Sequence, residues 1–142
     1  MNNASLQLAL FDRLNAIVAG DPELTGLAFH ADVVQPDFPE NDEAFPFCTF
    51  GVDATTPFNT KSWVGTSVIA SIDIWSRERN FIETKTISDA LWANLDNSPL
   101  TLRVAATGEA FMMTVVGADF MHDPDGVTKH GNLTVRILTA DI

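Results

Sequence analysis

Two stretches of the chain repeat apolar residues at the spacing of an α-helix. The first covers residues 4–19 and has apolar side chains at Leu6, Leu10, Leu14 and Ile17. The second begins near Asn80, with Glu83 three residues on in the manner of a capping box, and ends near residues 96–97. Its apolar positions are Ile87, Leu91 and Leu95. An apolar side chain on every turn lines one face of a helix, so the sequence predicts two amphipathic helices.

Six other stretches show the pattern of β-strands. The clearest covers residues 64–74, where every even-numbered position is apolar or threonine and the odd-numbered positions include Ser67, Ser71 and Asp73. The other five alternate in the same way or are rich in β-branched and aromatic residues, and they cover residues 27–34, 47–53, 102–106, 112–118 and 133–137. A period of two predicts strands with one buried face and one face open to water.

The predicted order of elements is a helix, three strands, a helix and three strands. Residues 107–109, Thr-Gly-Glu, form a short turn signal between two of the later strands. Strands and helices do not alternate regularly, which argues against a doubly wound nucleotide-binding fold. The sequence therefore predicts an α+β fold, with a largely antiparallel sheet and two helices packed on one of its faces.

Length and composition narrow the class of protein. The chain has 142 residues, of which 46% are hydrophobic, and this size predicts one domain over residues 1–142. No apolar run approaches the roughly 18 residues of a spanning helix, and the N-terminus lacks the basic start of a secretory signal. We therefore expect a soluble protein that is not exported and does not bind a membrane. The one cysteine, Cys48, lies between Phe47 and Phe50 and is interpreted as a buried thiol.

The negative charge is concentrated in the first part of the chain. The formal net charge is −11, from 19 Asp and Glu against 8 Lys and Arg. Residues 1–60 carry nine acids and one base, and four of these acids lie in the proline-rich stretch 35–46 at Asp37, Glu40, Asp42 and Glu43. This stretch is predicted to be an exposed, extended loop, whose acids either form a solvated surface or take part in contacts. The lack of a basic cluster argues against nonspecific binding of nucleic acid.

Two tryptophans fall on the polar side of the clearest strand. Trp63 and Trp75 are odd-numbered, like Ser67, Ser71 and Asp73. Aromatic side chains on such a face either cover a sheet edge or contact another chain, since aromatic residues are enriched at interfaces. Both interpretations stay open for each tryptophan.

One stretch gathers side chains that bind metals. Residues 121–131 contain His122, Asp123, Asp125 and His130. Their spacing matches neither a zinc site nor an EF-hand loop, and Asp-Pro and Asp-Gly are ordinary turn formers. The chain also lacks a nucleophile elbow and the glycine-rich phosphate-binding patterns. We therefore expect no enzyme activity and no cofactor, with a small metal-dependent hydrolase or ligand-binding module that uses this loop as the alternative.

Four short motifs occur in an order that resembles a known family. They are Leu6-x-x-Ala9-Leu10-Phe11-x-x-Leu14, Phe45-Pro46-Phe47, Ile72-Asp73-Ile74-Trp75-Ser76, and Asp125-Gly126 followed by His130-Gly131. In their joint order they resemble the small tail-completion, or tail-terminator, proteins of long-tailed phages and phage-derived gene transfer agents. The resemblance covers roughly residues 5–140. The acidic insert at residues 37–44 and the absence of tyrosine depart from the family pattern.

The resemblance implies a structural role in virion assembly. Members of this family are expected to form a hexameric ring that caps the tail tube, stops its polymerisation and joins the tail to the head connector. The implied partners are other copies of the chain, the tail tube protein and the head-tail connector protein. The implied location is the head-proximal end of the virion tail, after assembly in the cytoplasm of the bacterial host.

A ring gives the aromatic residues and the acids a possible use. A closed ring needs two different patches on each subunit, and we expect Phe58, Trp63, Trp75 and the acidic residues Asp37, Glu40, Asp42 and Glu43 to contribute to contacts. Carboxylates that line a channel repel phosphates, so DNA would pass through without specific binding.

Overall fold

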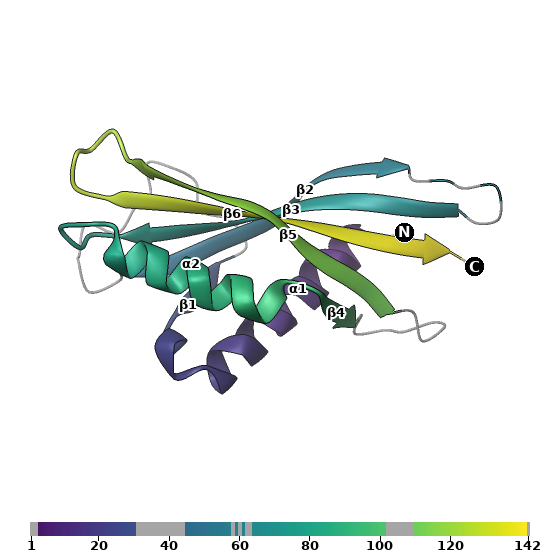
Figure 1. Ribbon diagram of the computed structural model, residues 1–142, viewed down its shortest axis with the longest axis horizontal. Coiled ribbons are helices and arrows are strands. Elements are labelled where there is room, and N and C mark those ends of the chain that lie inside the picture. Colours follow the sequence, from purple (N-terminus) through teal and green to yellow (C-terminus); the bar gives the residue numbers. More distant parts are fainter. Residues whose placement is uncertain are drawn as a thin grey trace.

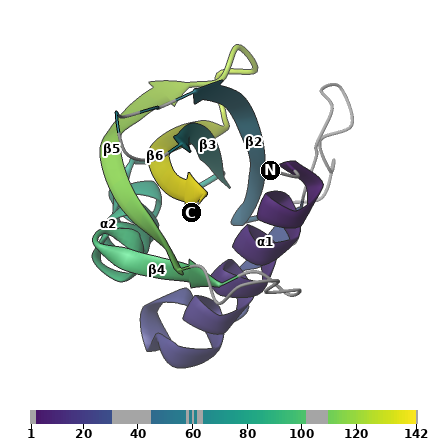
Figure 2. The same cartoon turned by 90° about the vertical axis from the view of Figure 1, so that its right-hand side faces the viewer.

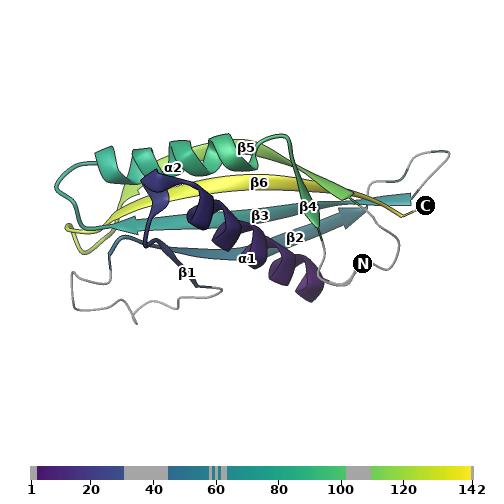
Figure 3. The ribbon, with the colours of Figure 1, turned by 90° about the horizontal axis from the view of Figure 1, so that it is seen from below.

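The helices lie together on one side of a twisted sheet (Figures 1 and 3). The computed structural model describes residues 3–30, 45–57, 59, 61, 64–101 and 110–141. In these ranges the elements follow the order α1 (Asn3–Gly20), η1 (Pro22–Leu24), β1 (Ala28–His30), β2 (Phe47–Pro57), β3 (Val64–Ser76), α2 (Ile82–Leu95), β4 (Ser98–Thr101), β5 (Ala110–His122) and β6 (Lys129–Asp141). The α+β class and both predicted helices are thereby confirmed. Viewed along the long axis of the molecule, the strands curl round in an arc (Figure 2).

The sheet is mixed, which corrects the prediction of a largely antiparallel sheet. The described strands are ordered β1-β2-β3-β6-β5-β4. β1 runs parallel to β2, with Ala28 opposite Phe47, whereas the four other neighbouring pairs are antiparallel. Parallel neighbours need a connection of a dozen or more residues. The sixteen residues between His30 and Phe47 meet that requirement, and a short hairpin turn would not.

The order of elements also differs from the predicted one in two places. The 3₁₀-helix η1 lies between α1 and β1, where Asp21 caps it by accepting a hydrogen bond from the amide of Glu23 at 3.0 Å. The strand β4 lies at residues 98–101, ahead of the predicted strand. Its Pro99 is compatible with a strand because β4 is at the edge of the sheet. The stretch 102–106 and the turn 107–109 lie outside the described residues.

The core lies between the two helices and the sheet face that they cover. The helices contribute Leu6, Leu10, Leu14, Leu91 and Leu95, each with no exposed surface. The sheet contributes the even-numbered side chains of β3 from Val68 to Ile74 and the odd-numbered side chains of β6 from Leu133 to Ile137. The alternation read in residues 64–74 therefore gave the correct buried face. Burial of each large side chain stabilises the fold by about 1.5–3 kcal/mol.

Polar contacts fix how the helices meet the rest of the chain. The side-chain amide of Asn94, near the end of α2, donates to a carboxylate oxygen of Asp21 at 3.0 Å, and the guanidinium of Arg13 donates to the carbonyl of Asn94 at 3.2 Å. Just after α2, the carboxylate of Asp96 accepts the backbone amide of Val115 at 2.9 Å. This last contact lies at a β-bulge, where the pairing of β5 with β6 shifts by one residue.

Candidate functional site on the outer face of the sheet

The face of the sheet away from the helices, called the outer face below, carries a polar network. The carboxylate of Asp73 on β3 lies 2.7 Å from the Nε2 atom of His130 and accepts a hydrogen bond from the side-chain amide of Asn132 at 2.9 Å. Both partners come from β6, where Asn132 is directly opposite Asp73. The register of this strand pair, rather than any sequence motif, brings the three side chains together.

The network also sets the ionisation of Asp73. Partial burial raises the pKa of this carboxyl, but the hydrogen bonds from His130 and Asn132 and the charge of His130 outweigh burial, so its pKa lies below the ordinary value. His130 and Asp73 keep 19% and 27% of their side-chain surface exposed. The pair is therefore an ion pair at the surface of the sheet when His130 is protonated.

Trp75 is covered by its own chain. Its ring stacks on His130 with centroids 3.9 Å apart and an angle of 7° between the planes, and its Nε1 atom donates to the hydroxyl of Thr49 at 3.2 Å. Only 8% of Trp75 is exposed. The sequence indicated the correct face for this side chain but not its cover, because His130 is 55 positions away along the chain and becomes a neighbour only through strand pairing.

An exposed apolar patch lies on the same outer face, over the N-terminal half of β5 and the C-terminal part of β6. It consists of Met112, Val116 and Leu138, whose exposed fractions are 51%, 53% and 37%. Met112 and Leu138 are direct cross-strand partners, and the bulge between Val115 and Gly117 leaves Val116 exposed. The inward positions of β5 are instead Met113 and Val115, both buried. Exposed apolar groups gathered in this way mark interaction surfaces.

Arg136 lies in the middle of this patch. It is exposed, is opposite Thr114 on β5, and precedes Leu138 by two positions on β6. Side chains two positions apart share a face and are about 7 Å apart along the strand. Of the residues that the structure describes, none forms a hydrogen bond or an ion pair with the guanidinium of Arg136.

Most of the residues predicted from the sequence to make contacts fall where the structure gives no description. Phe58, Trp63, Asp37, Glu40, Asp42 and Glu43 all lie outside the described residues. Their contact roles, like that of Trp75, stay predictions. The side chains of the apolar patch were not singled out from the sequence, because residues 112–116 carry a Met and a Val on both faces of the strand and alternation alone does not show which face is buried.

The loop at residues 121–131 forms a turn of its own. The carboxylate of Asp125 accepts the backbone amides of Val127 and Thr128 at 2.8 Å each and the hydroxyl of Thr128 at 2.5 Å. The hydrogen bonds from Thr128 hold the pKa of Asp125 below its usual value. Gly126, with a φ of 75°, adopts the left-handed conformation that the turn requires.

The two histidines of this loop do not converge on a common point. His130 contacts Asp73 on the outer face, whereas His122 contacts the ring of Phe81 edge-on, with centroids 4.9 Å apart. His122 on β5 is opposite Lys129, and His130 on β6 is opposite Met121. The two histidines thus belong to neighbouring cross-strand pairs, whose side chains point to opposite faces of the sheet. Within the described residues, no three His, Cys, Asp or Glu side chains are grouped so as to hold a metal ion.

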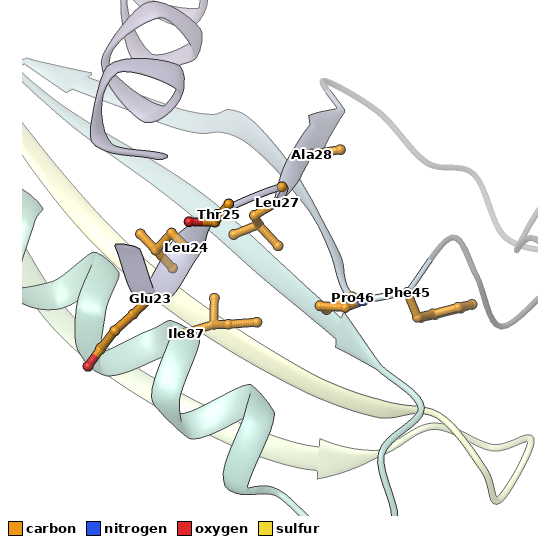
Figure 4. A pocket seen from close by; sticks show the side chains of 9 residues that line it. Glu23, Leu24, Thr25, Leu27, Ala28, Phe45, Pro46 and Ile87 are labelled. Carbon is orange, nitrogen blue, oxygen red and sulfur yellow. The ribbon is translucent and has the colours of Figure 1, made fainter. Parts of the chain in front are cut away.

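A cavity of about 330 Å³ opens beside the start of β1 and β2 (Figure 4). Its walls include Leu24, Leu27, Pro46 and Ile87, and Glu23 supplies the one charged side chain at its rim. The side chain of Glu23 extends away from these apolar groups in Figure 4. The lining holds one carboxylate, Glu23, and one hydroxyl, Thr25, which donates to the carbonyl of Pro22 at 2.9 Å rather than to that carboxylate.

Two further features bear on possible chemistry. Burial, with a smaller effect from the charge of Asp73, raises the pKa of the Cys48 thiol, so the thiolate that a nucleophile requires is disfavoured. None of the helices that the structure describes is long and apolar enough to cross a membrane.

Comparison of the sequence with known proteins shows the family to which the chain is similar. Residues 10–140 match the family described as "Tail completion protein gp17". The protein of that name from Bacillus phage SPP1 is 32% identical over 99 residues, which cover 69% of this chain and 70% of the relative.

Two solved structures share the fold. A chain in the structure described as "Virion of native gene transfer agent (GTA) particle" superposes with a TM-score of 0.73 at 15% identity, covering 97% of this chain and 96% of that chain. The structure of bacteriophage SPP1 gp17 gives a TM-score of 0.53 at 24% identity, covering 93% and 89%. At these identities the two structures support the fold alone, while the sequence match over residues 10–140 carries the assignment. The chain therefore belongs to the family of the tail completion protein gp17, whose members are structural components of phage tails.

Proposed function

We propose that the chain ends the growing tail tube and joins the finished tail to the head. In this role copies of the chain form a hexameric ring that caps the last layer of tube protein, stops further addition, and offers its other side to the head-tail connector protein. The match to the tail completion family over residues 10–140 carries this proposal. The ring would sit at the head-proximal end of the virion tail, after assembly in the cytoplasm of the bacterial host.

The surface of the chain supports a role in assembly rather than in catalysis. The described residues place an apolar patch and an arginine without an ion pair on the outer face. In the loop that carries the metal-binding residue types, the carboxylate of Asp125 accepts hydrogen bonds from within its own turn. A protein that works through contacts with its neighbours needs exposed apolar surface of this kind. The chain would act as one unit over residues 1–142, without a cofactor and without enzyme activity.

The excess of negative charge fits a channel through which DNA moves. With a net charge of −11, a ring of this chain would repel phosphates on any surface where the carboxylates gather. In this proposal Asp37, Glu40, Asp42 and Glu43 face the channel or the partner proteins, and Phe58 and Trp63 contribute to contacts between copies. DNA would then pass without being held.

Removal of the gene tests the proposal. Particles from cells that lack the chain are examined by negative-stain electron microscopy and compared with particles from complemented cells. The proposal expects tails of irregular, excessive length and tails detached from filled heads, because nothing stops the tube or joins it to the connector. Tails of normal length attached to heads in the deletion strain would refute it.

A further inference from the structure

A second exposed surface lies on the solvent side of α2 and differs in chemistry from the apolar patch. Trp92 is 38% exposed, although the neighbouring Leu91 is fully buried, and Asp89 lies one turn before Trp92 on the exposed side of the helix. Lys85, on the preceding turn, lies over the rings of Phe120 and Phe81 at 5.4 and 5.9 Å. Asp89 has no hydrogen-bonding or ion-pair partner in the part of the chain that the structure describes. An exposed carboxylate thus lies beside an exposed indole, and Asp89 and Trp92 are called the helix surface below.

The helix surface and the apolar patch complement one another in charge and in apolar character. The patch places Arg136 among Met112, Val116 and Leu138, and Arg136 is the one Lys or Arg on the outer face of the strands that the structure describes. The helix surface places Asp89 beside Trp92. Tryptophan and arginine are the residue types that most often dominate binding energy at interfaces. An ion pair ringed by apolar side chains is also screened less by salt than one in open solvent.

The two surfaces face opposite sides of one subunit. Arg136 follows the buried Val135 on β6 and is therefore on the outer face, whereas Asp89 is an exposed residue of α2. The helix α2 lies on the other side of the sheet (Figures 1 and 3). They cannot meet within one chain. A head-to-tail ring requires two unlike patches on different sides of a subunit, because each copy then uses one patch for each neighbour.

We propose that the apolar patch around Arg136 binds the Asp89-Trp92 surface of the next copy of this chain. The inference rests on the proposed ring and names the surfaces that close it. Asp89 of one copy pairs with Arg136 of its neighbour, and the indole of Trp92 packs on Met112, Val116 and Leu138. The same contact repeats around the ring.

Cross-linking within purified particles tests this contact. The double variant Asp89→Cys with Arg136→Cys is expressed in the producing cells, and the purified particles are treated with a short bismaleimide reagent and analysed on a denaturing gel. Such a reagent is used because the two side chains of an Asp-Arg pair hold their Cα atoms farther apart than a disulfide allows. Cys48 is fully buried, so the introduced thiols are the accessible ones. The two positions are on opposite sides of the core and too far apart for such a reagent to join them within a chain, so each cross-link joins two copies. We expect a ladder of cross-linked species that extends up to the size of the whole ring.

A matched control uses Asp119 in place of Arg136. Asp119 is exposed on β5 and pairs with Asn132, four positions from Arg136 on β6, a distance of about 13 Å along the strand. The variant Asp89→Cys with Asp119→Cys should therefore give no ladder. A ladder in the control, or its absence in the Asp89 and Arg136 variant while the chain is present in the particles, would overturn the proposed contact.

Charge reversal gives a second, independent readout. The single variants Asp89→Arg and Arg136→Asp each place like charges together, and we expect each to lower the yield of complete particles at least tenfold. The combined variant restores the pair and should recover most of the yield. Singles that have no effect, or a combined variant as poor as the singles, would refute the pairing.

The outcomes separate this inference from the proposed function. Absence of the chain from particles, or normal tails in the deletion strain, counts against the tail-completion role itself. Presence of the chain in particles together with overlong tails in the deletion strain supports that role, and the cross-linking then decides whether these two surfaces form the contact. Thermal unfolding of each variant, which should match that of the parent chain because both positions are exposed, shows that the variants fold.

Discussion

Gly131 on β6 is a position where one added carbon should measurably strain the packing of α2 on the sheet. A Cβ atom at this position would lie 2.7 Å from the Cγ2 atom of Thr84 and 3.4 Å from two ring carbons of Phe120. Thr84 is fully buried on the first turn of α2. Its short β-branched side chain has little freedom to move aside, so α2 itself must shift.

The cost of Gly131→Ala follows from that contact. Overpacking of a buried site costs about 1–3 kcal/mol, which for a chain of this size lowers the melting temperature by about 4 °C for each kcal/mol. Urea unfolding and calorimetry of the purified chain measure both quantities. Gly117→Ala is the matched control, because it is in the same sheet and its added Cβ would have no atom within 4 Å.

The substitution Thr84→Ala tests whether the contact with Thr84 causes the loss of stability in Gly131→Ala. Thr84→Ala removes the methyl group in the way, and it also removes a buried hydroxyl that has no hydrogen-bond partner among the described residues. Loss of the methyl contact costs about 1 kcal/mol and loss of an unsatisfied polar group gains a similar amount, so the single change should be close to neutral. The double variant should then recover most of the stability lost in Gly131→Ala. The reasoning fails if Gly131→Ala is as stable as Gly117→Ala, or if Thr84→Ala brings no recovery.

Two other predictions concern ionisable groups. Asp73→Asn should lower the free energy of unfolding by about 1–3 kcal/mol at pH 7, because the charged acceptor of the hydrogen bonds from His130 and Asn132 is lost. Since the folded pKa of Asp73 is lowered, its contribution is present above the unfolded value near 4 and is lost as the pH falls through the folded value. Urea unfolding from pH 7 to pH 3 should show the difference between parent and variant shrinking, and a constant difference would contradict it. Cys48 should not react with an aromatic disulfide reagent in the folded chain and should react fully in urea, because its thiol is buried with a raised pKa. Rapid labelling of the native chain would contradict this.

The spacing of apolar residues along the chain predicted those elements of the fold in which one face is buried against the core. The helical spacing from Leu6 to Ile17 and from Ile87 to Leu95 predicted α1 and α2, because one face of each helix meets the core. The alternation in residues 64–74 predicted the buried face of β3 for the same reason. Parallel pairing of β1 with β2 was not predictable in this way, because the direction of a strand depends on the path of the chain between the two strands.

Cross-strand relations decide most of the candidate site, and local patterns do not contain them. Trp75 is covered because strand pairing places His130 opposite it. Met112 and Val116 are exposed while Met113 and Val115 are buried. Each face of this stretch carries one Met and one Val, so alternation alone does not show which face is buried. The family, in contrast, was identifiable from the sequence, since the order of short motifs along a chain does not require knowledge of its pairing.

A reconstruction of the junction between head and tail in the intact particle tests the central claim most directly. Cryo-electron microscopy of purified particles, with the density of this junction fitted by the present fold, shows where the chain lies and how its copies meet. The account predicts one ring of this chain between the last layer of tube protein and the connector, with Arg136 of each copy next to Asp89 of its neighbour. Density for the chain along the shaft of the tail or inside the head, and none at the junction, would contradict it.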